Sequence, residues 1–158
     1  MNTYLLLKWL HIVSSVLMVG TGLGSAFYMY FTNRSASVPA QAVVSRLVVR
    51  ADWCFTAPTV ILQPATGLLL AYMAGWPLAT PWLALSLALF VLAGACWLPV
   101  VWLQLRMAAM AQQAEANQTG LAPLYWRYAR CWEALGYPAF VAMAAVFFLM
   151  VNKPGLWQ

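Results

Sequence analysis

The chain has 158 residues, of which 65% are hydrophobic and only 7% are charged, and its mean hydropathy is +0.78. A water-soluble domain typically carries about 25% charged residues, so this chain has too few to cover a water-facing surface. We therefore expect lipid to be its solvent. The formal net charge of +5 does not indicate nucleic-acid binding, because the basic residues lie at the ends of apolar segments, where a membrane accounts for them.

Four apolar segments follow one another along the chain, at Tyr4 to Phe31, Asp52 to Ala74, Trp82 to Gln104 and Trp132 to Val151. Each is close to the roughly 20 residues that a helix needs to cross a bilayer. Helices are the expected form, since they satisfy their own backbone hydrogen bonds inside lipid. The sequence thus predicts an all-α integral membrane bundle, with residues 1–158 forming a single domain of four transmembrane helices.

The connections between these segments differ in character. Residues 33–39 are polar, and Pro39 suits the first turn of a new helix. Residues 43–50 read as an amphipathic helix that leads into the second span. Residues 75–81 form a short uncharged turn, and residues 111–123 form the longest polar stretch, which we expect to be a loop.

The distribution of charge predicts the orientation. The first and third loops and the helix ends beside them hold Arg34, Arg46, Arg50, Arg106, Arg127 and Arg130. The opposite side holds only Lys8 and Lys153. The positive-inside rule places the arginine-rich loops in the cytoplasm and both termini outside. An aromatic belt is then expected at the outer interface, formed by Trp9, Trp76, Trp82 and Trp157.

His11, the only histidine, lies about two turns into the first span. Helical spacing places Ser14, Ser15 and Met18 on or near its face. An ionisable residue at this depth usually faces the bundle interior and has a partner there. One interpretation is a packing histidine, bonded to a serine or a backbone carbonyl. The other is a ligand of haem iron, either five-coordinate, paired with a methionine such as Met18, or shared between subunits.

Two further polar residues in the spans are candidates for the same site. Lys8 precedes His11 by one turn, and either extends to the interface or pairs with an anion such as a haem propionate. Gln63 lies in the middle of the second span beside Pro64, which is expected to kink the helix. Gln63 is expected to bond the freed backbone, another helix or a ligand carbonyl.

Charged residues also gather at the cytoplasmic ends of the spans. Arg130 and Glu133 are spaced as a helical ion pair, and Asp52 is expected to reach an arginine across helices. We interpret this group as an ion-pair network at the inner interface; the alternative is a site for propionates, lipid phosphates or a partner protein. Its members are Arg50, Asp52, Arg127, Arg130 and Glu133.

Four stretches of the sequence carry a family resemblance: LLLKWLHIVSSVLMVGTGLGSAFYM, DWCFTAPTVILQPATGLLLA, CWLPVVWLQLRM and YWRYARCWEALGYPAFVAMAAVFFLMVNKP. They resemble a family of bacterial four-helix inner-membrane proteins of unknown function, and they cover most of the chain. The resemblance implies a multi-pass protein of the bacterial inner membrane.

A more distant resemblance concerns the order of three short motifs: LKxLHI, then PxxIL followed by TGLLL, then a closing KP. This order is similar to that of the membrane-bound protoporphyrinogen oxidases, which are four-helical and bind haem b. The resemblance implies haem binding at His11, and it matches Lys153 and Pro154 to the closing motif. A lysine near the end of the second span belongs to that family's pattern and has no counterpart here, which puts the oxidase activity in doubt.

The sequence leaves three functions open. The first is a membrane haem b protein, protoporphyrinogen oxidase-like or linked to quinone, with a site formed by His11, Lys8, Gln63 and Met18. The second is a non-enzymatic scaffold or accessory subunit, whose partner is a second copy of the chain or a membrane complex. The third is a small lipid-binding or solute-binding permease. In each case the lipid bilayer is a partner and nucleic acid is not.

Overall fold

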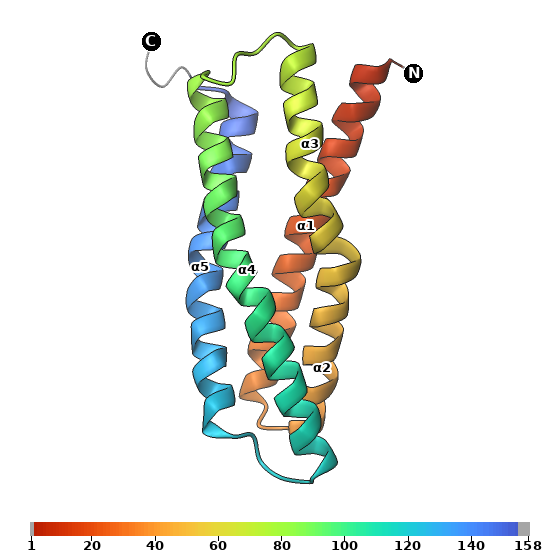
Figure 1. Ribbon diagram of the computed structural model, residues 1–158, viewed down its shortest axis with the longest axis vertical. Helices are drawn as coiled ribbons and strands as arrows, with labels where there is room; N and C mark the ends of the chain where they lie inside the picture. Colours follow the sequence, from red (N-terminus) through yellow and green to blue (C-terminus); the bar gives the residue numbers. More distant parts are fainter. Residues whose placement is uncertain (1, 155–158) are drawn as a thin grey trace.

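The computed structural model describes residues 2–154, and all regular structure in that part of the chain is helical. The first span is α1, Thr3–Arg34. The second is a continuous run of α2 (Val38–Ala51), η1 (Asp52–Thr56) and α3 (Ala57–Met73). The third and fourth are α4 (Pro81–Ala116) and α5 (Pro123–Asn152). These are four helical rods that are long and apolar enough to cross a membrane, so the predicted all-α bundle of four spans is confirmed (Figure 1).

Local sequence explains where the helices begin. The side chain of Asn2 accepts a hydrogen bond from the backbone of Tyr4, and that of Ser37 accepts one from Ala40. Proline occupies the first turn of α2, α4 and α5, where its missing N–H costs nothing. The third loop is shorter than predicted, because α4 continues through a segment rich in alanine and glutamine to Ala116.

The main irregularity of the second span lies at Asp52–Thr56, which forms a π-helix. The cause is Pro58, which offers no N–H and whose ring would clash with the carbonyl four residues earlier in a regular α-helix. The wider π-turn accommodates the proline, and the Thr59 hydroxyl bonds the carbonyls of Phe55 and Thr56 at 2.6 and 2.9 Å. The sequence had drawn attention to Pro64 instead, which lies inside α3 without interrupting the helix.

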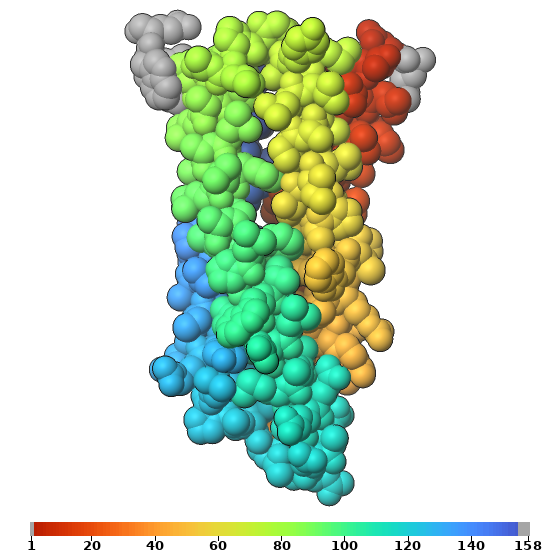
Figure 2. All heavy atoms as spheres, in the orientation of Figure 1, coloured from red at the N-terminus to blue at the C-terminus, as the bar shows by residue number. Residues whose placement is uncertain are grey.

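The helices pack differently in the two halves of the bundle. At the arginine-rich end, α1, α2, α4 and α5 share a core around Met29, Met107, Tyr125 and Trp132. At the other end a smaller cluster joins Ala71, Trp82, Leu83 and Leu149. Figure 2 shows a hollow between α3 (yellow) and the half of α4 nearer the loop from α3 (green), with α5 (blue) visible behind it.

The two ends of the bundle carry the charges as predicted. The six arginines lie on α1, α2, α4 and α5 near the loops that join α1 to α2 and α4 to α5. The helix ends at Thr3 and Asn152 lie at the opposite end, beside the loop from α3 to α4 (Figure 1). The placement of both termini outside the cell remains a prediction of the positive-inside rule. Trp157, assigned to the outer aromatic belt, is outside the described residues.

Candidate functional site

His11 lies at the contact between α1 and α3 in the half of the bundle that is predicted to face outward, which is called the outer half below. Its ring is half-buried, and its Nδ1 atom is 2.8 Å from Oγ1 of Thr66. Thr66 is 3% exposed, so this contact is almost fully shielded from lipid on the α3 side. The expectation that a histidine at this depth has a polar partner is therefore met by a threonine that sequence inspection had passed over.

The hydrogen bonds of Thr66 determine which ring nitrogen of His11 carries the proton. The Thr66 hydroxyl has a single hydrogen, which it directs to the carbonyl of Leu62 at 2.7 Å. Its oxygen is then an acceptor for Nδ1–H of His11, and this assignment follows from the hydrogen-bond network. The neutral ring consequently keeps the lone pair on Nε2, which makes no hydrogen bond to any described residue.

The backbone around His11 is fixed by Gln63. The Gln63 amide nitrogen donates to the carbonyl of His11 at 2.8 Å and to Oγ of Ser14 at 2.9 Å. Ser14 in turn donates to the same carbonyl at 3.0 Å. Gln63 therefore bonds another helix, one of the alternatives predicted for it. Both of its N–H groups are used in doing so, and it acts on the site by holding α1 against α3.

Gly67 allows the imidazole to lie close against α3. A Cβ atom at this position would be 3.1 Å from Cε1 of His11, which is tighter than an ordinary van der Waals contact. Gly67 thus leaves room for the imidazole ring, and Thr66, the residue before it, binds the ring by a hydrogen bond. The pair belongs to the TGLLL motif, and its function in positioning the ring was not evident from the sequence.

The other predicted members of the site lie at different distances from the imidazole. Lys8 is exposed, so its ammonium group is free to reach the outer interface. Met18 is 7% exposed and lies two turns further along α1, about 10 Å from His11 at 1.5 Å of rise per residue. Binding of a cofactor by Lys8, Met18 or Gln63 stays a prediction.

The donor set at this site has a definite chemical character. Within residues 2–154, no group of three or more histidine, cysteine or carboxylate side chains is gathered to hold a metal ion. The three cysteines are separate, free thiols. His11 Nε2 is therefore a single neutral imidazole donor, which is the kind of donor that haem iron takes from proteins when the porphyrin supplies its other ligands.

A second polar cluster lies nearer the arginine-rich end, around the π-helix. Asp52 is 6% exposed, and its Oδ1 accepts a hydrogen bond from Thr56 at 2.9 Å. With its amide nitrogen turned toward the carboxylate, Gln104 donates to Oδ2 of Asp52 and accepts from Nε1 of Trp132 at 3.2 Å. The prediction that Asp52 reaches an arginine is wrong, because two neutral donors bind the carboxylate, Thr56 from the π-helix and Gln104 from α4.

The ion pair at this end also differs from the prediction. Glu133 was expected to bind Arg130 along α5, but it binds Arg34 of α1, with 3.2 Å between Oε1 and the guanidinium. Arg34 also stacks on the Tyr30 ring and donates to the Tyr30 carbonyl. The pair therefore links two helices, and Arg130 makes no ion pair with any residue from 2 to 154.

The comparison with known protein families agrees with this architecture. Residues 5–154 match a family described as predicted integral membrane protein (DUF2269). No curated protein and no solved structure matches the chain. Because the match covers all four spans, the chain belongs to the DUF2269 family of predicted integral membrane proteins.

Proposed function

We propose that this protein binds haem b through Nε2 of His11 and takes part in membrane redox chemistry, either on a porphyrinogen or towards quinone. The observation that supports the proposal is the hydrogen bond from His11 to Thr66, which occupies Nδ1 and leaves Nε2 as the free donor. Histidines that bind metals nearly always engage their other ring nitrogen in this way, because the bond fixes the tautomer and the ring orientation.

The surroundings of His11 fit a planar group of this kind. Gly67 lets the imidazole ring lie directly against α3, with no side chain between them. The hollow between α3 and α4 lies in the same half of the bundle as His11 (Figure 2). When bound, haem supplies an iron that exchanges single electrons, and the protein sets its potential through the axial ligand and the surrounding dielectric.

The residues of this chain then have separate functions. His11 is the ligand, and Thr66 holds the ring and favours the tautomer with the lone pair on Nε2. Gln63 and Ser14 fix the backbone of α1 at the height of the ligand. Lys8, one turn closer to the outer interface, is the nearest cation along α1 for a propionate group. The lipid-exposed surface of α3 and α4 offers a path for an apolar substrate.

The experiment is an ultraviolet–visible spectrum of the detergent-purified protein, oxidised and then reduced with dithionite. The wild type is expected to show a Soret band that shifts on reduction. His11→Ala is expected to lose the band, and added imidazole is expected to restore part of it. The matched control is Ser15→Ala, a neighbouring residue whose hydroxyl bonds only its own helix at Ile12.

Circular dichroism separates loss of the ligand from loss of the fold. Both variants are expected to keep the helical spectrum, because the spans do not depend on the imidazole for their backbone hydrogen bonds. Full retention of haem by His11→Ala would remove His11 as the ligand. A wild-type protein that is colourless after expression in haem-replete cells would refute the proposal and favour the scaffold or accessory-subunit interpretation.

A further inference from the structure

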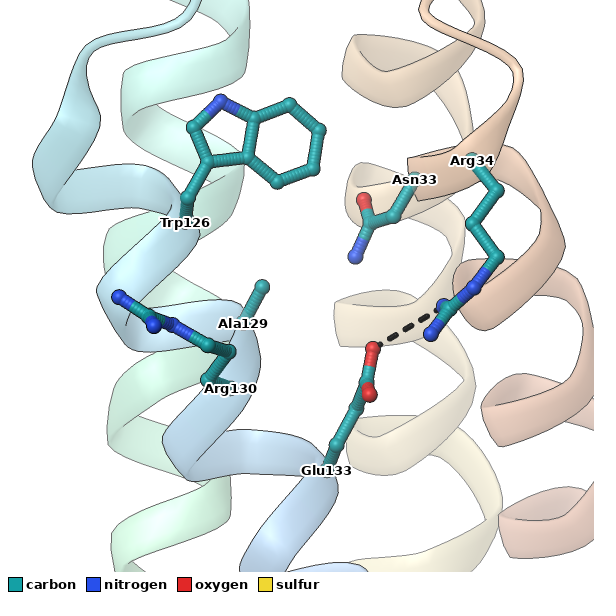
Figure 3. A pocket seen from close by; sticks show the side chains of 6 residues that line it. All are labelled: Asn33, Arg34, Trp126, Ala129, Arg130 and Glu133. Carbon is teal, nitrogen blue, oxygen red and sulfur yellow. Dashed lines mark hydrogen bonds and ion pairs between the residues drawn. The ribbon is translucent and has the colours of Figure 1, made fainter.

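A second site is formed where the end of α1 meets the beginning of α5, at the arginine-rich end of the bundle. The two helices line an open cavity of about 280 Å³ there. Figure 3 shows the side chains that line it, which are Asn33, Arg34, Trp126, Ala129, Arg130 and Glu133. This cavity is far from His11, since 22 residues of α1 separate Asn33 from the histidine, about 33 Å at 1.5 Å per residue.

The Asn33 side chain has a donor in this cavity without a partner. Asn33 is 5% exposed, and its Oδ1 accepts a hydrogen bond from the hydroxyl of Tyr125 at 2.7 Å. Tyr125 is fully buried, so turning the amide around would leave its hydroxyl proton without this acceptor. The orientation is thereby fixed, and Nδ2 points into the cavity (Figure 3). Nδ2 is buried and has no hydrogen-bond partner among residues 2–154.

A buried N–H group without a partner is unfavourable, so an acceptor from outside the chain is expected at this position. The charges around the cavity indicate which kind of acceptor. Arg34 and Glu133 neutralise each other across the cavity at 3.2 Å. Arg130 also lines the cavity and is exposed, and Figure 3 shows its guanidinium pointing away from Asn33 and from the ion pair of Arg34 with Glu133. The lining therefore carries one unbalanced positive charge, which suits an anionic acceptor.

An apolar groove continues from the same place. A second cavity of about 290 Å³ shares Glu133 with the first and runs between α1 and α5. Its lining is largely aromatic and includes Phe27, Phe31, Trp132, Tyr137 and Phe140. Gly136 also lines the groove, and a Cβ atom there would meet no atom within 4 Å. Since α1 and α5 contact each other little, this groove is open to lipid along the bundle.

We propose that these two cavities together bind one anionic phospholipid of the cytoplasmic leaflet. The phosphate accepts the hydrogen bond from Asn33 Nδ2 and balances the charge of Arg130. An acyl chain lies in the groove between α1 and α5, where aromatic side chains provide the apolar contact. The Asn33 donor lies at the end of the apolar groove, as the head group lies at the end of the acyl chains in a phospholipid. Trp126 lines the same cavity, and tryptophan is common at the membrane interface.

The test is native mass spectrometry of the full-length protein, titrated with phosphatidylglycerol or phosphatidylcholine. We expect one phosphatidylglycerol to bind at least about tenfold more tightly than phosphatidylcholine, a difference of about 1.4 kcal/mol. Asn33→Asp keeps the acceptor for Tyr125 but replaces the donor with a carboxylate that repels phosphate. It is expected to lose this preference. The matched control is Asn117→Asp, which makes the same change of charge at an exposed position next to the end of α4.

Two further measurements keep the proposal testable. If Asn33→Asp does not fold, Arg130→Gln is compared with Arg46→Gln, both at exposed positions, and only the first is expected to weaken phosphatidylglycerol binding. Gly136→Leu, which places a side chain in the groove, is expected to weaken it as well, whereas Gly20→Leu, at an exposed position with no atom near its Cβ, is not.

Equal binding of the two lipids, or unchanged preference in both Asn33→Asp and Arg130→Gln, would overturn the proposal. Displacement of the lipid by inorganic phosphate at an equal concentration would also overturn it, since the site would then recognise the free anion alone. None of these outcomes depends on haem, because His11→Ala is expected to bind phosphatidylglycerol as the wild type does.

Discussion

Replacing Thr66 with valine tests the arrangement on which the candidate site depends. Valine has nearly the shape of threonine, so the change removes the hydroxyl and little else. His11 loses the acceptor of its Nδ1–H group at 2.8 Å, and Thr66 loses its bonds to the carbonyls of Leu62 and Gln63. The matched control is Thr59→Val on the same helix. The Thr59 hydroxyl is similarly buried and bonds only carbonyls of its own chain segment.

The difference between these two variants isolates the bond to His11, because both lose hydroxyl bonds to nearby carbonyls. A hydrogen bond between membrane helices contributes about 0.6 kcal/mol on average and up to about 1.7 kcal/mol. Thr66→Val is therefore expected to lower the free energy of unfolding by about 0.6–1.7 kcal/mol more than Thr59→Val does. If haem is bound, the same variant is also expected to weaken its retention, because the ring is no longer held in one orientation.

The assay is unfolding in mixed micelles of mild detergent and sodium dodecyl sulfate, followed by circular dichroism. Each threonine variant is also made in the His11→Ala background to complete a double-mutant cycle. The cycle is expected to show a coupling between Thr66 and His11 of the same size as the difference above, and none between Thr59 and His11. Equal losses for the two threonines, with no coupling in either cycle, would refute the arrangement.

Two other substitutions test neighbouring contacts by the same unfolding assay. Gly67→Leu forces side-chain atoms into the space of the histidine ring and is expected to lower the free energy of unfolding by about 1–3 kcal/mol. The control is Gly94→Leu, where a Cβ would meet nothing within 4 Å, and it is expected to lower the stability less. A larger loss for Gly94→Leu would contradict the close contact between Gly67 and His11. Gln104→Leu leaves Oδ2 of Asp52 and the Trp132 indole N–H without their buried partner, while Thr56 still binds Oδ1, so a loss of about 2 kcal/mol or more is expected. A loss below about 0.5 kcal/mol, the range of a neutral surface change, would show that Gln104 does not join these groups.

The number and order of the spans could be predicted because they depend on composition alone. A segment of about twenty predominantly apolar residues forms a helix in lipid, and the structure has four helices that are long and apolar enough to span a membrane. The ends of the helices were less well predicted. The apolar segment ends at Gln104, but α4 continues to Ala116. Residues 105–116 are rich in alanine and glutamine, which favour a helix outside the membrane as well, so the end of the apolar segment did not predict the end of the helix.

Only the part of the candidate site that lies on one helix could be predicted from the sequence. His11 and its neighbours on α1 follow from periodicity. Thr66 and Gly67 are small residues of a second helix, and their importance comes from the register between α1 and α3, which no local pattern specifies. The partners of Asp52 also depend on how helices pack, since Gln104 reaches it from α4. Likewise, Glu133 binds Arg34, 99 positions away, because the packing of the bundle brings these two helices together.

The two proposed sites bear on one structural question, which is how α1 is held in the bundle. Its outer half is bonded to α3 through Gln63, Thr66 and His11. Its other half packs against α2 and η1, and it meets α5 at few points, which include the pair of Arg34 with Glu133 and the hydrogen bond from Tyr125 to Asn33. A phospholipid between α1 and α5 would fill the contact that the protein leaves open. Because about 33 Å of α1 separates this lipid from His11, more than the roughly 30 Å of the hydrocarbon core, the two sites lie in opposite leaflets and each is expected to bind without the other.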